Sequence, residues 1–180
     1  MRHRHALLAG LALLVAGLDQ LSKFWVLWSI GPHEAVPVIP GFFSLVLVLN
    51  RGSSFGMFNS DSITWQRPVL IIASLVAMAV IIYLAHILRE RRPWQIVGLG
   101  LILGGALGNL VDRVRLGQVV DFLYFGLYGW HWPAFNVADC GITVGAATLI
   151  LTMPWRDKPR ETSDGSHPAK HPSDERGAHD

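Results

Sequence analysis

The sequence predicts a helical membrane protein with four transmembrane helices and a small β-sheet on one side of the bilayer. Hydrophobic residues make up 51% of the 180 residues and charged residues only 16%, against about 25% charged in soluble domains. The apolar residues gather into four stretches, each near the length of ~20 residues that crosses a bilayer. A further apolar stretch is interrupted by proline and glycine, which favours short strands. We expect a single domain over residues 1–155.

The four predicted spans differ in composition. Residues 69–88 contain no charged side chain, residues 94–111 are equally free of charge, and residues 137–155 carry Asp139 near their start. The first span, about 6–28, begins with 13 apolar or glycine residues and then turns polar before its apolar character resumes. The arginines before it resemble the start of a signal peptide, but no clean cleavage site follows. We therefore expect this span to be retained.

Basic residues predict how the chain is oriented in the membrane. Four spans place both termini on one side, and that side carries 10 of the 15 Lys and Arg residues. Because basic residues are in excess on the cytoplasmic side, we expect both termini in the cytoplasm. Their position beside the spans also argues against nucleic acid as a partner. The tail, residues 156–180, lacks Val, Ile, Leu, Met and aromatic residues, which predicts a disordered polar segment.

Two segments are expected on the outer side. Residues 36–60 contain the short aliphatic run Leu45–Leu49 followed by a Gly-Ser turn, which predicts a small antiparallel sheet against the membrane face. Residues 112–135 mix charged and aromatic side chains. They are too apolar for a free loop and too short to cross the membrane and return, so we predict an interfacial or re-entrant segment.

Polar side chains inside or beside a span are costly there, so each is a candidate functional residue. Asp19 and Lys23 are four residues apart in the first span, where a helical ion pair is the simpler interpretation. Asn109 and Arg113 have the same spacing at the end of the third span. The simpler interpretation of these two residues is structural: Asn109 caps the helix and the Arg113 side chain extends toward the interface.

Asp121 and Asp139 are harder to explain as structural residues. Asp121 stands between apolar neighbours, and Asp139 begins the last span, where its structural gain is the helix dipole. Two carboxylates brought close together share a proton. The ionised partner can then activate water while the protonated partner polarises an amide carbonyl. The sequence permits this pair without requiring it, because the 17 intervening residues can close in many ways.

Other chemistries are less well supported. No nucleophile-elbow pattern surrounds Ser53 or Ser54, and no His-Glu-x-x-His pattern indicates zinc. Cys140 lies inside a span beside a carboxylate, so packing is its expected role. The glycines of the third span predict close helix packing: Gly98, Gly100, Gly104, Gly105 and Gly108.

Five motifs follow one another along the chain from the first span to Trp155. They are Leu18-Asp19-Gln20-Leu21-Ser22-Lys23, Asn50-Arg51-Gly52-Ser53-Ser54-Phe55-Gly56, Gly108-Asn109-Leu110-Val111-Asp112-Arg113, Val119-Val120-Asp121-Phe122 and Phe135-Asn136-Val137-Ala138-Asp139. Together they resemble the bacterial lipoprotein signal peptidase (signal peptidase II) family. In that family the second motif usually has alanine after its glycine, whereas this sequence has Ser53, which affects the expected substrate contacts and not the chemistry.

The resemblance implies an intramembrane aspartyl peptidase of the bacterial inner membrane, with its active site at the outer face. Such enzymes cut prolipoproteins just before a cysteine that carries diacylglyceryl. By motif position, Asp121 and Asp139 are the catalytic pair, and a polar shell orients them or binds substrate: Asp19, Lys23, Asn50, Gly52, Asn109, Arg113 and Asn136. Arg113 is expected to hold one aspartate ionised.

The implied partners are a lipid-modified prolipoprotein and the membrane lipids, and we expect a monomer. Since water is the nucleophile, no metal or cofactor is expected. Two other classes stay open. A small ion-coupled transporter would spread polar groups through the depth of the membrane, and a lipoprotein assembly factor would use the outer sheet to bind a partner strand.

Overall fold

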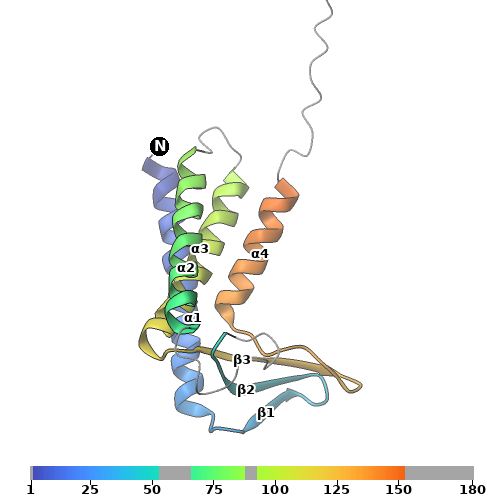
Figure 1. Cartoon of the computed structure of the whole chain (residues 1–180). Helices are drawn as coiled ribbons and strands as arrows, with labels where there is room; N and C mark the ends of the chain where they lie inside the picture. The colour runs from blue at the N-terminus through green and yellow to red at the C-terminus, as the bar shows by residue number, and fades with distance from the viewer. Residues whose placement is uncertain (1, 53–65, 88–92, 153–180) are drawn as a thin grey trace, which may run out of the picture.

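The computed structural model describes residues 2–52, 66–87 and 93–152 and shows helices standing above a sheet that lies across one of their ends (Figure 1). The elements follow the chain in this order: α1 (Arg2–Ser29), β1 (Ala35–Ile39), β2 (Phe43–Asn50), α2 (Gln66–Ile87), α3 (Pro93–Arg115), β3 (Val119–Leu127), β4 (Trp130–His131) and α4 (Val137–Thr152). The predicted polar tail, residues 156–180, and the end of the predicted outer β region lie outside the described residues.

Among the described residues, three helices are long and apolar enough to cross a membrane: His3–Ser29, Gln66–Ile87 and Pro93–Arg115. They contain the first and third predicted spans and nearly all of the second. The helix α4 is apolar but has only 16 residues, or ~24 Å at 1.5 Å per residue. The last three residues of its predicted span lie outside the described residues. The N-terminus and the C-terminal end of α4 lie at the same end of the helices, away from the sheet (Figure 1).

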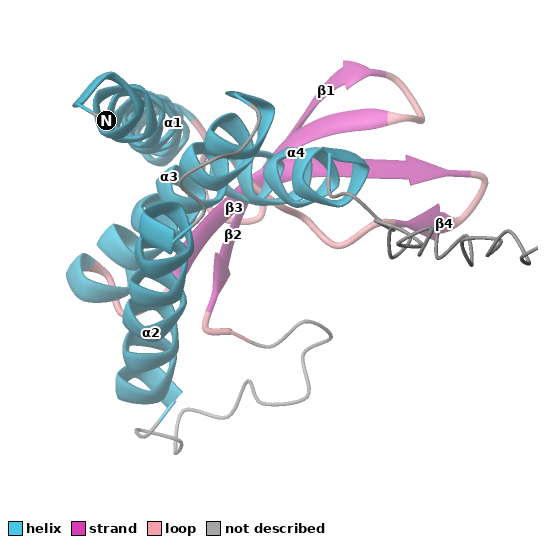
Figure 2. Cartoon of the chain, turned by 90° about the horizontal axis from the view of Figure 1, so that it is seen from above, coloured by secondary structure: helices cyan, strands magenta, loops and turns pink. Residues whose placement is uncertain are grey.

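The helix α3 stands at the centre, with α1, α2 and α4 around it (Figure 2). Its glycines let the other helices approach closely. A Cβ on Gly104 would lie 2.6 Å from the carbonyl oxygen of Ala12, and one on Gly98 would lie 2.9 Å from that of Gly145. Real Cβ atoms do not come so near to a backbone oxygen, so these positions require glycine. The predicted close packing of the third span is confirmed.

The helix α2 differs from α3 because it packs against α3 alone among the described helices and strands. Ile72 and Val76 are more than half exposed, as are several other large apolar side chains of this helix. In water such a surface would be unfavourable, whereas hydrocarbon is its natural environment. The arrangement therefore supports a membrane location.

The sheet is antiparallel with the strand order β1-β2-β3-β4. The segment 112–135, predicted to be interfacial or re-entrant, contributes β3 to this sheet, and β3 pairs with β2 from Phe43↔Phe125 to Asn50↔Val119. The apolar character of this segment reflects its packing: Phe122 is buried against Val26 and Ile30 at the end of α1. This packing places β3 directly beside the helix ends.

Candidate active site

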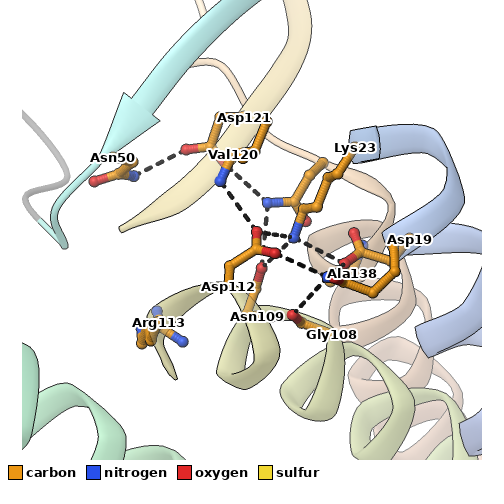
Figure 3. Close-up of polar contacts among 12 residues, drawn as sticks. Asp19, Lys23, Asn50, Gly108, Asn109, Asp112, Arg113, Val120, Asp121 and Ala138 are labelled. Carbon is orange, nitrogen blue, oxygen red and sulfur yellow. Dashed lines mark hydrogen bonds and ion pairs between the residues drawn. The ribbon is translucent and has the colours of Figure 1, made fainter. Parts of the chain in front are cut away.

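The predicted site residues come together where the helices end at the sheet (Figure 3). Asp121 lies on β3, opposite Val48 of β2, and Asn50 is the last residue of β2. The helix α3 supplies Asn109 in its C-terminal part, and Asp139 lies in the first turn of α4. Residues that are far apart in the sequence thus meet in a layer at one end of the helices.

Asp121 accepts hydrogen bonds from two side-chain amides. Asn50 Nδ2 donates to Oδ2 at 2.9 Å, and Asn136 Nδ2 donates to Oδ1 at 2.7 Å. The orientation of the Asn50 amide is fixed, because its oxygen accepts the backbone N–H of Gly52 at 2.8 Å. Gly52 has a φ of +102°, a conformation that favours glycine, so this residue shapes the turn that aims Asn50 at Asp121.

Asp139 is held by a reciprocal capping arrangement at the start of α4. The backbone N–H of Asp139 donates to Asn136 Oδ1 at 3.0 Å, and the Asn136 backbone N–H donates back to Asp139 Oδ2 at 3.3 Å. Asn109 Nδ2 donates to the other carboxylate oxygen of Asp139 at 2.8 Å. Asn136 is fully buried and contacts both predicted catalytic aspartates, so it fixes them relative to each other.

Burial distinguishes the two aspartates. Asp121 is only 3% exposed, whereas Asp139 is half-buried. The pKa of Asp121 is raised to about 6, mainly by burial and also by the neighbouring charge of Asp139, and the hydrogen bonds from Asn50 and Asn136 limit the rise. Asp121 can therefore hold or release a proton near neutral pH.

Lys23 lies behind this pair and is 2% exposed. Its ammonium group forms ion pairs with Asp19 Oδ2 and Asp112 Oδ2, both at 2.8 Å, and donates to Asn109 Oδ1 at 3.0 Å. The predicted ion pair between Asp19 and Lys23 is thus present. It belongs to a larger buried network, which Figure 3 shows between α1 and α3.

Asp112 and Gln20 were not predicted as site residues. Asp112 accepts the backbone N–H of Val120 at 3.1 Å, and Gln20 Nε2 donates to Asp112 Oδ1 at 2.8 Å. Asp19 similarly accepts the backbone N–H of Ala138 at 2.8 Å. These carboxylates tie the helices to β3 and to the start of α4. A usable signal was present, because Asp112 follows Asn109 by three residues and so shares its helix face.

Arg113 was predicted to hold one aspartate ionised, and its charge interacts with those of Asp139, Asp112 and Asp121. Among the described residues it forms no ion pair with Asp121 or Asp139, and its Nη1 donates to Ser74 Oγ of α2 at 3.3 Å. Its Nε is buried without a hydrogen-bond partner. Arg113 therefore lies beside the pair without binding it.

Within the described part of the chain, no three His, Cys, Asp or Glu side chains are grouped so as to hold a metal ion.

Comparison with known proteins gives a consistent result. A family described as "Signal peptidase (SPase) II" matches residues 11–155. A lipoprotein signal peptidase of Syntrophotalea carbinolica is 47% identical over 150 residues, covering 82% of this chain and 89% of the relative. Another, from Burkholderia vietnamiensis, is 48% identical over 141 residues, covering 78% of this chain and 83% of the relative.

Two solved structures share the fold. Both are described as bacterial membrane enzymes determined by the in meso method, and both are 26% identical to this chain. One has a TM-score of 0.68, with 82% of this chain and 90% of the other covered. The second has a TM-score of 0.69, with coverages of 82% and 92%.

Proposed function

Because the chain belongs to the signal peptidase II family, proteases that remove signal peptides from lipoproteins, we propose that Asp121 and Asp139 are its catalytic pair. The bond they hydrolyse is the peptide bond just before a cysteine that carries diacylglyceryl. The observation that carries this proposal is the set of hydrogen bonds that hold the two aspartates. Asn136 contacts both aspartates, and the hydrogen bonds that the described residues donate to their side chains come from neutral groups.

The absence of a bonded cation matters for the charge of the pair. No Lys or Arg among the described residues forms an ion pair with Asp121 or Asp139. Two neighbouring carboxylates that no cation binds directly are most stable when they share one proton. Such a pair contains both the base and the acid that amide hydrolysis requires.

The two environments support different roles. Asp139 is half-buried at the start of α4, so it is the carboxylate of the pair that water can reach. Asp121 is buried on a strand, and its pKa is raised to about 6 by that burial. Asp139 is therefore the base and Asp121 the acid.

In the reaction, Asp139 takes a proton from water as the water oxygen bonds to the scissile carbonyl carbon. Asp121 gives its proton to the carbonyl oxygen. When the C–N bond breaks, the carbonyl forms again and returns its proton to Asp121, while the proton on Asp139 goes to the leaving amine. Water is consumed, and both aspartates regain their starting states.

The location of the pair suits a lipidated substrate. The site lies at one end of the membrane helices (Figure 1), so acyl chains can stay in the bilayer while the scissile amide reaches the interface. We place this end at the outer face of the inner membrane and both termini in the cytoplasm, following the excess of basic residues on the other side. Because Asn136 contacts both aspartates within one copy of the chain, the proposed reaction requires no second copy, and we propose action as a monomer.

The test is a cleavage assay with purified protein and a prolipoprotein modified with diacylglyceryl. The matched control is the same prolipoprotein without the lipid. We expect cleavage of the lipidated form only, with the new N-terminus at the modified cysteine by mass spectrometry. Cleavage at another bond would contradict the proposed substrate. If the lipidated form stayed intact with folded protein, the peptidase proposal would fail, and an ion-flux assay would then test the transporter alternative.

A further inference from the structure

We propose that Lys23 is a positioning residue that acts on Asp139 through the side-chain amide of Asn109. The inference rests on the proposed function, because it takes Asp139 to be the catalytic base. It assigns Lys23 a role in turnover in addition to its ion pairs with Asp19 and Asp112.

All three hydrogen-bond donors of Lys23 are in use. An ammonium group has three N–H bonds and cannot accept a hydrogen bond. Its three short contacts are with Asp19 Oδ2, Asp112 Oδ2 and Asn109 Oδ1, at 2.8, 2.8 and 3.0 Å. Each N–H therefore has its own acceptor, and the group has little freedom to rotate. The two carboxylates already neutralise the ammonium, so the charge of Lys23 does not require its bond to Asn109.

The bond from Lys23 fixes which way the Asn109 amide points. Its oxygen faces the ammonium, so its NH₂ group faces Asp139, to which it donates at 2.8 Å. A rotation of the amide by 180° would place NH₂ against the ammonium and the oxygen against the carboxylate. Both contacts would be repulsive. Asn136 Nδ2 supports the same orientation with a longer bond of 3.3 Å to Asn109 Oδ1.

Without Lys23, only the weaker donor from Asn136 would hold the Asn109 oxygen. The amide would then lose its strict orientation, and Asp139 would lose an aligned donor. Small displacements of a reacting group can reduce rates by about 100-fold. We therefore expect that a misaligned Asp139 lowers kcat. Substrate affinity should not change, since Asn109 bonds to Asp139 and to other protein groups in this network.

The experiment is a double-mutant cycle, which measures whether two residues act through each other. Lys23→Met alone would leave two buried carboxylates, Asp19 and Asp112, with no cation, so every variant carries Asp112→Asn, which reduces them to one. In that background, kcat and KM are measured with Lys23 or Met, and with Asn109 or Ala. Elution profile and thermal melt establish the folding of each of the four proteins.

With Asn109 present, Lys23→Met is expected to lower kcat by about 100-fold without changing KM. With Asn109→Ala, the same substitution should lower kcat by less than about threefold, because Lys23 then has no amide to orient. Equal losses of kcat with Asn109 and with Asn109→Ala would overturn the proposal. An effect of Lys23→Met on KM alone would also overturn it. Either result would give Lys23 a purely structural role.

If the Lys23→Met variants do not fold, the cycle is run with Lys23→Arg and the native Asp112, which keeps the buried positive charge. A loss of kcat that disappears with Asn109→Ala supports the proposal, whereas an equal loss in both backgrounds, or none in either, overturns it. Asp139→Asn is assayed in parallel. If Asp139→Asn cleaves normally, the proposed catalytic pair is wrong. If it is inactive and the cycle shows no coupling, only the inference about Lys23 fails.

Discussion

Four aspartates meet at the sheet end of the helices, and among the described residues only two of them form an ion pair. Asp19 and Asp112 share the ammonium of Lys23, whereas Asp121 and Asp139 accept hydrogen bonds from amides. Burial alone does not explain this difference, because Asp121 is 3% exposed and Asp112 is 2% exposed, although Asp139 is half-buried. The partner decides the chemistry. The lysine-bound carboxylates join α1 to α3, β3 and α4, whereas Asp121, held by amides, has a pKa of about 6 and can exchange a proton near neutral pH.

The largest expected effect comes from breaking the lysine-bound pair at Gly108. A Cβ on this residue would lie 2.5 Å from Asp19 Oδ2, and Asp19 is held on both sides by Lys23 and Ala138. Gly108→Val should therefore disrupt the network and prevent stable folding. Yield and thermal melt in detergent measure this effect.

A valine on α1 provides the control for Gly108→Val. A Cβ on Gly10 would meet no heavy atom of the described residues within 4 Å, so Gly10→Val should melt within a few degrees of the wild type. If both valine variants folded equally well, the network would not depend on the close approach of Asp19 to α3.

A smaller effect is expected in the amide-bound pair, as a change in pH dependence. The bond from Asn50 lowers the pKa of Asp121, which burial has raised to about 6. Asn50→Ala removes that bond, so the pKa rises and Asp121 keeps its proton to higher pH. With Asp121 as the acid, the alkaline limb of kcat/KM should move up by about one pH unit.

The pH profile of the wild type is measured beside that of Asn50→Ala, under the same buffer and detergent conditions. A limb that moved to lower pH, or did not move, would contradict the assignment of Asp121 as the acid.

The smallest effect is expected at the edge of the site, where α2 meets Arg113. Ser74 Oγ accepts a bond of 3.3 Å from Arg113 Nη1, a long contact for a hydrogen bond. Ser74→Ala should therefore change kcat by less than about threefold, as measured in the same cleavage assay. A loss as large as that expected for the catalytic pair would mean that Arg113 must be held by α2 for turnover.

The sequence predicts the helices better than the sheet, and the reason is physical. A membrane span is recorded locally in a run of apolar residues, so α1, α2 and α3 lie near their predicted bounds. The pairing of Val48 with Asp121 joins segments from different parts of the chain, and no local pattern records such a contact. The segment that contains β3 was consequently predicted as interfacial without its strand pairing.

In the candidate site too, local spacing predicted contacts within one helix but not contacts between elements. The positions of Asp121 and Asp139 were predicted from motifs, and the spacing of Asp19 and Lys23 correctly predicted their ion pair. That spacing could not show that Lys23 also binds Asp112 on α3, because a helix spacing describes neighbours within one helix only. Arg113 was predicted to hold one aspartate ionised; among the described side chains it bonds Ser74, and it acts on Asp139 through its charge.

The most direct test of this account replaces each of the four aspartates by asparagine and measures both kcat and Tm. Asp121→Asn and Asp139→Asn should lower kcat by about 1000-fold and keep a Tm within a few degrees of the wild type. Asp19→Asn and Asp112→Asn should lower the Tm by about 10 °C and affect kcat far less. Near-normal cleavage by folded Asp121→Asn or Asp139→Asn would contradict the account.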